Sequence, residues 1–185
     1  MSPMRRVAGA LFGQRAGYVA IVILALLAVH FFGFRGMRFF MVPSGSMENT
    51  LFPTDHIVTL REGEYRRGDI VVALDPHGEG NIVKRITGVS GDRLSVERGG
   101  LLINSAYASE PYMLEPMVYT MPPTHPVPSG QVFLMGDNRN YSDDSSTDGT
   151  TIPVEDIVGR VRFIYYPYDR WGPVHFYPLL NSRGE

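Results

Sequence analysis

The pattern of hydrophobic and polar positions divides the chain into two parts. Residues 16–34 form a run without a charged side chain, nineteen residues by count and close to the roughly 20 that a helix needs to cross a bilayer. After residue 41, apolar and polar positions alternate in short runs bounded by Gly, Pro and Asp, as in half-buried strands. The sequence therefore predicts one apolar helix followed by a mainly β region.

The expected strands are short, alternating and separated by turn residues. They lie at 56–60, 69–74, 81–86, 93–96, 101–103, 131–135 and 157–166. Gly99-Gly100 separates two of them and predicts a hairpin, whereas residues 105–130, rich in Pro, Tyr and Met, predict a long connection. Because no helical pattern follows residue 41, a βαβ layout is excluded, and we expect a mainly β fold, either a compact β-barrel or two packed sheets.

The apolar run has two interpretations, a cleaved secretory signal or a permanent anchor. The bulky and charged residues 35–41 that follow it provide no small-x-small cleavage site, which favours an uncleaved signal anchor. Three arginines precede the run and two follow it, a narrow bias that places the N-terminus in the cytoplasm. We therefore predict a cytoplasmic N-terminus at 1–15, a transmembrane anchor at 16–34 and an extracytoplasmic β domain at 35–185 in a single-pass protein.

Composition removes several classes of function. The chain has a net charge of −2, and because residues 1–41 carry five arginines and no acid, the remainder carries −7. This is not the basic surface of a nucleic-acid-binding protein. The chain has no cysteine, and its histidines lack ligand spacing, so we expect neither a metal site nor a cofactor. The sequence does not indicate the oligomeric state.

One cation differs from all the others, because sixteen of the seventeen Lys and Arg residues are arginine and the only lysine is Lys84. In a strand, alternation places Lys84 on the same face as Ile82 and Ile86. A lysine there either extends its ammonium to water or is desolvated. In the second case its pKa falls, and a neutral amine can remove a proton from a serine hydroxyl.

Two serines flank a glycine in the sequence Pro43-Ser44-Gly45-Ser46-Met47. Pro43 and Gly45 favour a tight, non-helical corner that would expose the hydroxyl groups. Taken alone, an ordinary Ser-Gly turn is the more common structure. A Ser-His-Asp triad also stays open, since His56, His77, His125 and His175 are available.

Four short motifs follow one another along the chain. They are Pro43-Ser44-Gly45-Ser46-Met47, Arg67–Val72, Val83-Lys84-Arg85 with Gly88–Asp92, and Gly136-Asp137-Asn138-Arg139 with Ser142 and Asp144. Their order, over residues 40–165, resembles that of the type I signal (leader) peptidases, a family of serine endopeptidases with a Ser-Lys dyad.

The resemblance implies a role for each matching residue. Ser46 would be the nucleophile and Lys84 the general base, with the Ser46 N–H and the Ser44 hydroxyl forming the oxyanion hole and Ser142 orienting the lysine. Val42 and Val83 would line pockets that admit only small side chains, hence cleavage after Ala-x-Ala. Arg85 and Asp137 would form a pair near the site, and Asn138, Arg139 and Asp144 would shape the surrounding loop.

The chain departs from the family pattern at three places. Thr54-Asp55 replaces a Gly-Asp pair, Ser90 replaces a proline, and Ser146 stands where an arginine is usual. The last change puts an ion pair of Asp144 in doubt. The short segment between Lys84 and Gly136 also predicts a compact member with a small second β subdomain.

The resemblance predicts removal of signal peptides from exported preproteins at the plasma or inner membrane, with the preproteins and the lipid bilayer as partners. Two alternatives remain open. One is a protease of the same fold that matures a single dedicated partner, and the other is a membrane-anchored β module that binds peptides without cleaving them.

Overall fold

The computed structural model describes residues 18–25, 27, 36–78 and 80–180, and the chain separates into two units, Met1–Gly36 and Met37–Glu185. In the first unit residues 18–25 and 27 are helical. Within the described residues, no helix has the length and apolarity required to cross a membrane. The expected cytoplasmic segment 1–15 and residues 16, 17, 26 and 28–34 of the expected anchor lie outside the described residues, so both predictions remain untested.

The second unit is built on one large antiparallel sheet with the strand order β1-β2-β10-β3-β4-β8-β9. A further strand, β11, pairs with β10, which contacts both β2 and β3 along its length. The strands are β1 (Met37–Met41), β2 (His56–Leu60), β3 (Ile70–Leu74), β4 (Asn81–Val89), β8 (Gln131–Met135), β9 (Ile152–Pro153), β10 (Ile157–Tyr166) and β11 (Gly172–Pro173).

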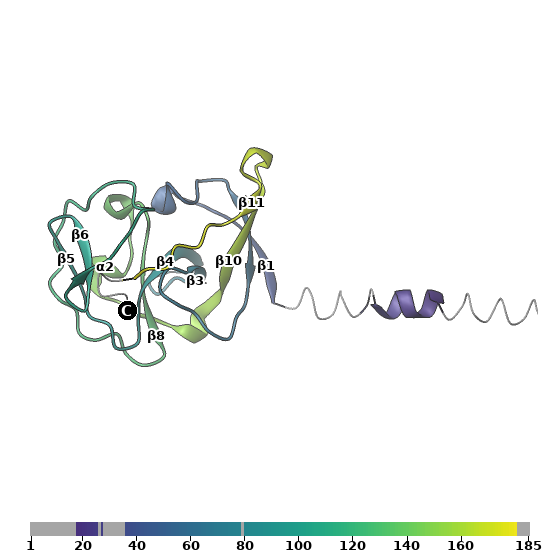
Figure 1. The fold of residues 1–185 in the computed structure, drawn as a ribbon, viewed down its shortest axis with the longest axis horizontal. Coiled ribbons are helices and arrows are strands. Elements are labelled where there is room, and N and C mark those ends of the chain that lie inside the picture. Colours follow the sequence, from purple (N-terminus) through teal and green to yellow (C-terminus); the bar gives the residue numbers. More distant parts are fainter. Residues whose placement is uncertain (1–17, 26, 28–35, 79, 181–185) are drawn as a thin grey trace, which may run out of the picture. The chain divides into compact units, whose positions relative to one another are not determined.

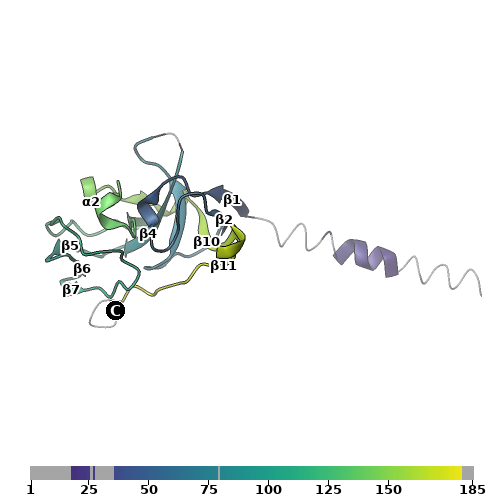
Figure 2. The same ribbon diagram turned by 90° about the horizontal axis from the view of Figure 1, so that it is seen from above.

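A second, smaller sheet contains β5 (Leu94–Glu97), β6 (Gly100–Ile103) and β7 (Ala106–Tyr107). Figures 1 and 2 show it at the end of the unit opposite β1 and β10, with β4 between them. Arg98 and Gly99 join β5 to β6 with φ values of 49° and 79°, as in the type I′ turns of two-residue hairpins. The predicted hairpin is therefore confirmed, one residue earlier than Gly99-Gly100.

The mainly β prediction is confirmed, but the barrel alternative is not. Among the described residues, β1 and β9 are the two end strands of the large sheet and do not pair with each other, so the sheet is not closed. The two-sheet alternative describes the fold. One short α-helix, α2 (Ser145–Asp148), was not predicted. It begins after Asp144, whose side chain accepts the Ser146 N–H, and ends at Gly149 with a φ of 79°, the usual pattern of helix caps.

Strand β4 separates two apolar clusters, because its side chains alternate between faces. Val83 packs with Val42, Met47, Ile70 and Val72 in one cluster. On the opposite face Ile82 and Ile86 pack with Val71, Leu134 and Ile157 in another. A third cluster joins the small sheet to β8 and includes Leu179 of the C-terminal segment, which returns from β11 towards the small sheet (Figure 1). Lys84 and Arg85 therefore project into different surroundings.

Candidate active site

Lys84 lies on the face of β4 that its alternation predicts. Ile82 and Lys84 line the same pocket, of about 270 Å³. The lysine is only 5% exposed, so the interpretation of a strand lysine with its ammonium in water is wrong.

Both hydroxyls of the Ser-Gly-Ser corner face this pocket. Gly45–Met47 form a single 3₁₀ turn, η2, preceded by Ser44 in extended conformation. The Ser44 side chain makes no capping hydrogen bond, and its hydroxyl donates to Ser46 Oγ at 3.4 Å. Ser46 itself is 9% exposed. The pocket is lined by Ser44, Ser46, Asp75, Pro76, His77, Ile82, Lys84, Leu134, Tyr141, Asp143, Asp144, Ser145, Asp148, Thr150 and Ile152.

The Lys84 amine has one hydrogen-bond partner among the described residues, Ser142 Oγ at 2.8 Å. Burial removes the ammonium from water and lowers the pKa of Lys84 below its usual value of 10.5. The carboxylates of Asp144 and Asp143 act in the opposite direction but do not cancel this effect. Lys84 is therefore more readily neutral than an exposed lysine.

Gly136 allows Ser142, the hydrogen-bond partner of Lys84, and the turn that carries Ser46 to lie close together. A Cβ atom at this position would come closer than 3.0 Å to both Ser142 Oγ and the Ser46 carbonyl oxygen. The second of these atoms belongs to main chain and cannot rotate away, so any larger residue would push the turn out of place. The glycine of the Gly-Asp-Asn-Arg motif thus has a steric role that its sequence context did not reveal.

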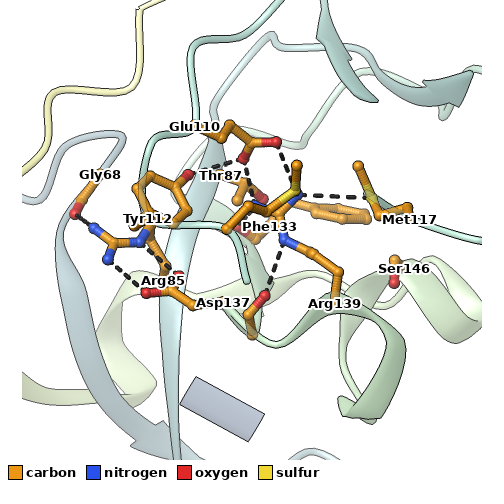
Figure 3. Close-up of polar contacts among 12 residues, drawn as sticks. Gly68, Arg85, Thr87, Glu110, Tyr112, Met117, Phe133, Asp137, Arg139 and Ser146 are labelled. Atoms are coloured by element: carbon orange, nitrogen blue, oxygen red, sulfur yellow. Dashed lines mark hydrogen bonds and ion pairs between the residues drawn. The ribbon is translucent and has the colours of Figure 1, made fainter. Parts of the chain in front are cut away.

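Arg85 points to the other face of β4 and forms a buried ion pair with Asp137 (Figure 3). Both side chains are fully buried, and two hydrogen bonds of 2.8 and 2.7 Å join the guanidinium to the carboxylate. The guanidinium also donates to the Gly68 carbonyl at 2.8 Å and lies 3.8 Å from the Tyr112 ring centroid. The pair expected from the family resemblance therefore forms. Thr50, which donates to Asp137 at 2.5 Å, extends it.

Arg139 forms a second buried pair with a residue that sequence reasoning missed, Glu110 (Figure 3). The arginine is fully buried and the side chain of Glu110 is 3% exposed, and Arg139 also donates to the Gly136 carbonyl at 2.9 Å. The adjacent carboxylate raises the pKa of the Arg139 guanidinium. Glu110 lies in the long connection 105–130, where no periodic pattern marks a buried position. The one available signal was that a buried arginine needs an acidic partner.

Asp144 forms no ion pair among the described residues, which answers the doubt raised by Ser146. Its carboxylate instead accepts the Gly136 N–H at 2.8 Å, the Ser146 N–H at 3.0 Å and the Ser146 hydroxyl at 2.7 Å. Ser146 also contacts the Tyr119 hydroxyl at 3.1 Å. Three short hydrogen bonds thus take the place of the expected arginine.

Two expected site residues lie in the core rather than on the pocket surface. Val42 is 2% exposed and Val83 is 7% exposed, and neither lines the pocket that contains Ser46 and Lys84. Their role in selecting small substrate side chains remains a prediction. Within the part of the chain that the structure describes, no cluster of His, Asp and Glu could hold a metal ion.

A hydroxyl group and a buried amine on one pocket are suited to acyl transfer, in which the amine deprotonates the hydroxyl. A backbone N–H and a second hydroxyl, from Ser46 and Ser44, lie on the same turn and can donate to a developing oxyanion. These groups are the ones that a serine hydrolase needs, so the site has the chemistry of that class.

Comparison with known proteins agrees with this class. The family model described as "Signal peptidase, peptidase S26" matches residues 15–166. The chain is 33% identical to a probable signal peptidase I-1 of Synechocystis over 80% of its own length and 83% of that protein. Thylakoidal processing peptidase 1 of Arabidopsis thaliana is 35% identical over 77% of the chain, which spans only 46% of that longer protein. A crystal structure of a signal peptidase I from Enterococcus faecalis superposes with a TM-score of 0.44 and 25% identity, over 52% of this chain and 96% of that one.

The family model spans most of the chain, and the Synechocystis protein is 33% identical to it over 80% of its length. The chain therefore belongs to the signal peptidase family, peptidase S26.

Proposed function

We propose that the chain removes N-terminal signal peptides from exported preproteins by a Ser-Lys dyad, cutting after Ala-x-Ala sites. Ser46 is the nucleophile and Lys84 is the general base. The observation that carries this proposal is the buried Lys84, which shares a pocket with Ser46 and has a lowered pKa. A lysine with no carboxylate bonded to its amine is costly to bury charged, and the neutral amine is the form that can accept a proton.

The reaction proceeds in two proton-balanced steps. Neutral Lys84 takes the Ser46 hydroxyl proton as Oγ attacks the scissile carbonyl carbon, and the resulting ammonium returns the proton to the leaving amine. An ester between Ser46 and the signal peptide remains. Water, deprotonated by Lys84, hydrolyses this ester and restores the serine hydroxyl. During both steps the Ser46 N–H and the Ser44 hydroxyl donate to the oxyanion.

The remaining residues position these groups. Ser142 holds the amine through its 2.8 Å hydrogen bond. The pairs Arg85–Asp137 and Arg139–Glu110 fix the loop that carries the motif Gly136–Arg139 against β4 and the long connection. Asp144 anchors the same loop through the Gly136 N–H.

An open strand edge beside the lysine supports binding of the cleavage region as an added strand. β8 pairs with β4 only from Arg85 to Val89, so Asn81–Lys84 have no partner on that side among the described residues. The Val42 main chain is less suited to this, because its N–H donates to Asp55 and its carbonyl accepts from Thr54. We place the substrate strand along the Val83 edge.

The apolar run at 16–34 supports a membrane location. Ser46 lies twelve positions beyond its end, so a fully extended link would keep the nucleophile within roughly 40 Å of the bilayer. We propose a single-pass protein of the plasma or inner membrane with a cytoplasmic N-terminus and the catalytic domain on the other side. A signal peptide whose apolar segment lies in the same bilayer would then present its cleavage site to Ser46.

Substitution of the dyad tests the reaction directly. In detergent, Ser46→Ala and Lys84→Ala should abolish cleavage of a preprotein while the thermal unfolding temperature stays near or above that of wild type. Lys84→Arg should be equally inactive, because arginine keeps the charge but cannot be deprotonated. A matched control is Ser90→Ala, which removes a hydroxyl that bonds the Gly130 N–H and does not line the pocket. Turnover by any dyad variant would refute the proposal.

The choice of substrates separates the remaining alternatives. Several unrelated preproteins should all be cut, whereas a protease dedicated to one partner would cut only one. A non-catalytic peptide-binding module would cut none and would leave Ser46 unlabelled by a serine-directed acylating probe.

A further inference from the structure

Asn138 holds both peptide units that flank Ser46. Its side-chain Nδ2 donates to the Gly45 carbonyl at 3.1 Å, and its main-chain N–H donates to the Ser46 carbonyl at 3.0 Å. Asn138 stands 93 residues beyond Gly45 in the chain. The Gly45 carbonyl also accepts the Glu48 N–H at 3.1 Å within the turn, so Asn138 adds to the turn's own hydrogen bond a second one from the Gly-Asp-Asn-Arg loop.

The bond to Gly45 acts on an atom that matters for the reaction. The Gly45 carbonyl and the Ser46 N–H belong to one planar peptide unit, and in a trans peptide the two bonds point in opposite directions. Holding the carbonyl therefore sets the direction of the N–H. A hydrogen bond to the carbonyl also polarises the peptide, which strengthens the N–H as a donor.

The Nδ2 donor of Asn138 is present even though the same amide leaves a buried oxygen without a hydrogen bond to any described residue. The residue is 5% exposed, and its Oδ1 is buried with no hydrogen-bond partner among the described residues. A buried acceptor without a hydrogen bond lowers the stability of the folded chain. Turning the amide over would place Oδ1 against the Gly45 carbonyl, which can only accept, so the orientation is fixed by the Nδ2 donor.

A purely structural role does not require the amide. The main-chain N–H of Asn138 already ties the loop to the Ser46 carbonyl, and any non-proline residue would supply that bond. What the side chain adds is the bond to the Gly45 peptide unit.

We infer that Asn138 is a positioning residue for the oxyanion hole, which it serves by orienting and polarising the Gly45–Ser46 peptide. The inference rests on the proposed role of the Ser46 N–H as an oxyanion donor. Because the oxyanion exists only along the reaction path, loss of this positioning acts on the transition state and not on substrate binding.

The test compares Asn138→Asp with Asn138→Ala, using a preprotein with an Ala-x-Ala site in detergent. Asn138→Asp keeps the shape but replaces the donor by an acceptor facing the Gly45 carbonyl. Direct removal of an oxyanion donor lowers kcat about 10²–10³-fold, and for loss of its positioning we expect a fall of about 10–100-fold. KM should stay within about twofold, since the lost interaction forms in the transition state.

The matched control is Asn140→Asp, on the same loop. Its Nδ2 donates to Glu115 at 2.8 Å and to the Pro116 carbonyl at 3.1 Å, so it loses comparable bonds without touching the turn. We expect its kcat to stay within about twofold of wild type. The midpoint of the kcat/KM–pH profile should be unchanged in Asn138→Ala, because this variant adds no charge near Lys84 and leaves its bond to Ser142.

Several outcomes would overturn the inference. These are a wild-type kcat in both Asn138 variants, a change in KM alone, or a shifted pH midpoint in Asn138→Ala, which would place the effect on the lysine. Unfolding of both variants at the assay temperature would also overturn it, because the side chain would then serve the fold. Ser46→Ala and Lys84→Ala run in parallel: if they are inactive, these results bear on Asn138 only, whereas activity in either would refute the proposed function itself.

Discussion

Lys84 and Arg85 are neighbours in the chain, yet the groups that surround their positive charges differ. Both are almost completely buried, on opposite faces of β4. Arg85 has a carboxylate, a carbonyl and an aromatic ring around it. Within the described part of the chain, the hydrogen-bond partner of Lys84 is a single hydroxyl, that of Ser142. The surroundings of Arg85 therefore stabilise its permanent positive charge. The surroundings of Lys84 stabilise an ammonium poorly and so favour the neutral amine, the form that a general base requires.

The difference also separates rigidity from reactivity. The ion pairs of Arg85 and Arg139 tie β4, the motif loop and the long connection into one network (Figure 3). The pocket on the opposite face contains small hydroxyl groups that can exchange partners as a substrate enters. The ion pairs on the Arg85 face of β4 thus support the pocket on its Lys84 face.

The largest expected effect is the loss of stability when the Arg85–Asp137 ion pair is broken. Arg85→Ala leaves Asp137 charged and buried, and removal of one partner of such a pair destabilises a protein by about 3–5 kcal/mol. Denaturant unfolding of the variant at neutral pH measures this loss. In a double-mutant cycle with Asp137→Ala, the double variant should lose less than the sum of the two single losses. Additive losses would show that the pair is not coupled.

Removal of the Lys84 amine should have the opposite effect and increase the stability of the protein. Because the folded-state pKa of Lys84 is lowered, its burial costs stability, about 1.4 kcal/mol for each unit of depression. Lys84→Met should therefore raise the free energy of unfolding at neutral pH.

The pH dependence of that gain follows from proton linkage. Between the folded-state pKa and 10.5 the unfolded chain binds more protons than the folded one, so wild-type stability rises with pH in this window. The advantage of Lys84→Met should thus be greatest at neutral pH and shrink as the pH approaches 10.5. A variant that is less stable than wild type at neutral pH would contradict the comparison.

Local pattern was sufficient to predict most of the fold. The alternation of 56–60, 81–86 and 157–166 produced strands at the observed positions, and it placed Lys84 on the Ile82 face correctly. These features depend on neighbours within a few residues. Closure of the sheet depends instead on strands that are distant in the chain. For this reason the sequence pattern could not distinguish a barrel from a two-sheet arrangement.

The site was less predictable because its contacts join distant segments. Glu110 meets Arg139 across 29 residues, and Asn138 meets Gly45 across 93. The tight fit at Gly136 joins two segments, residues 136–142 and the turn at Ser46, which converge only in the folded chain. Resemblance supplied the proposed dyad and the serine expected to orient its lysine, but the acidic partner in the long connection and the contacts of Asn138 with the Ser46 turn required the structure.

The most direct test of the account is the pKa of the Lys84 amine. Because Lys84 is the only lysine in the chain, selective isotope labelling of lysine yields one side-chain NMR signal, which can be followed from neutral to alkaline pH. We predict a midpoint below 10.5, matched by the pH at which kcat/KM rises as the amine becomes neutral. A midpoint at or above 10.5 in the folded protein would contradict the assignment of Lys84 as the general base.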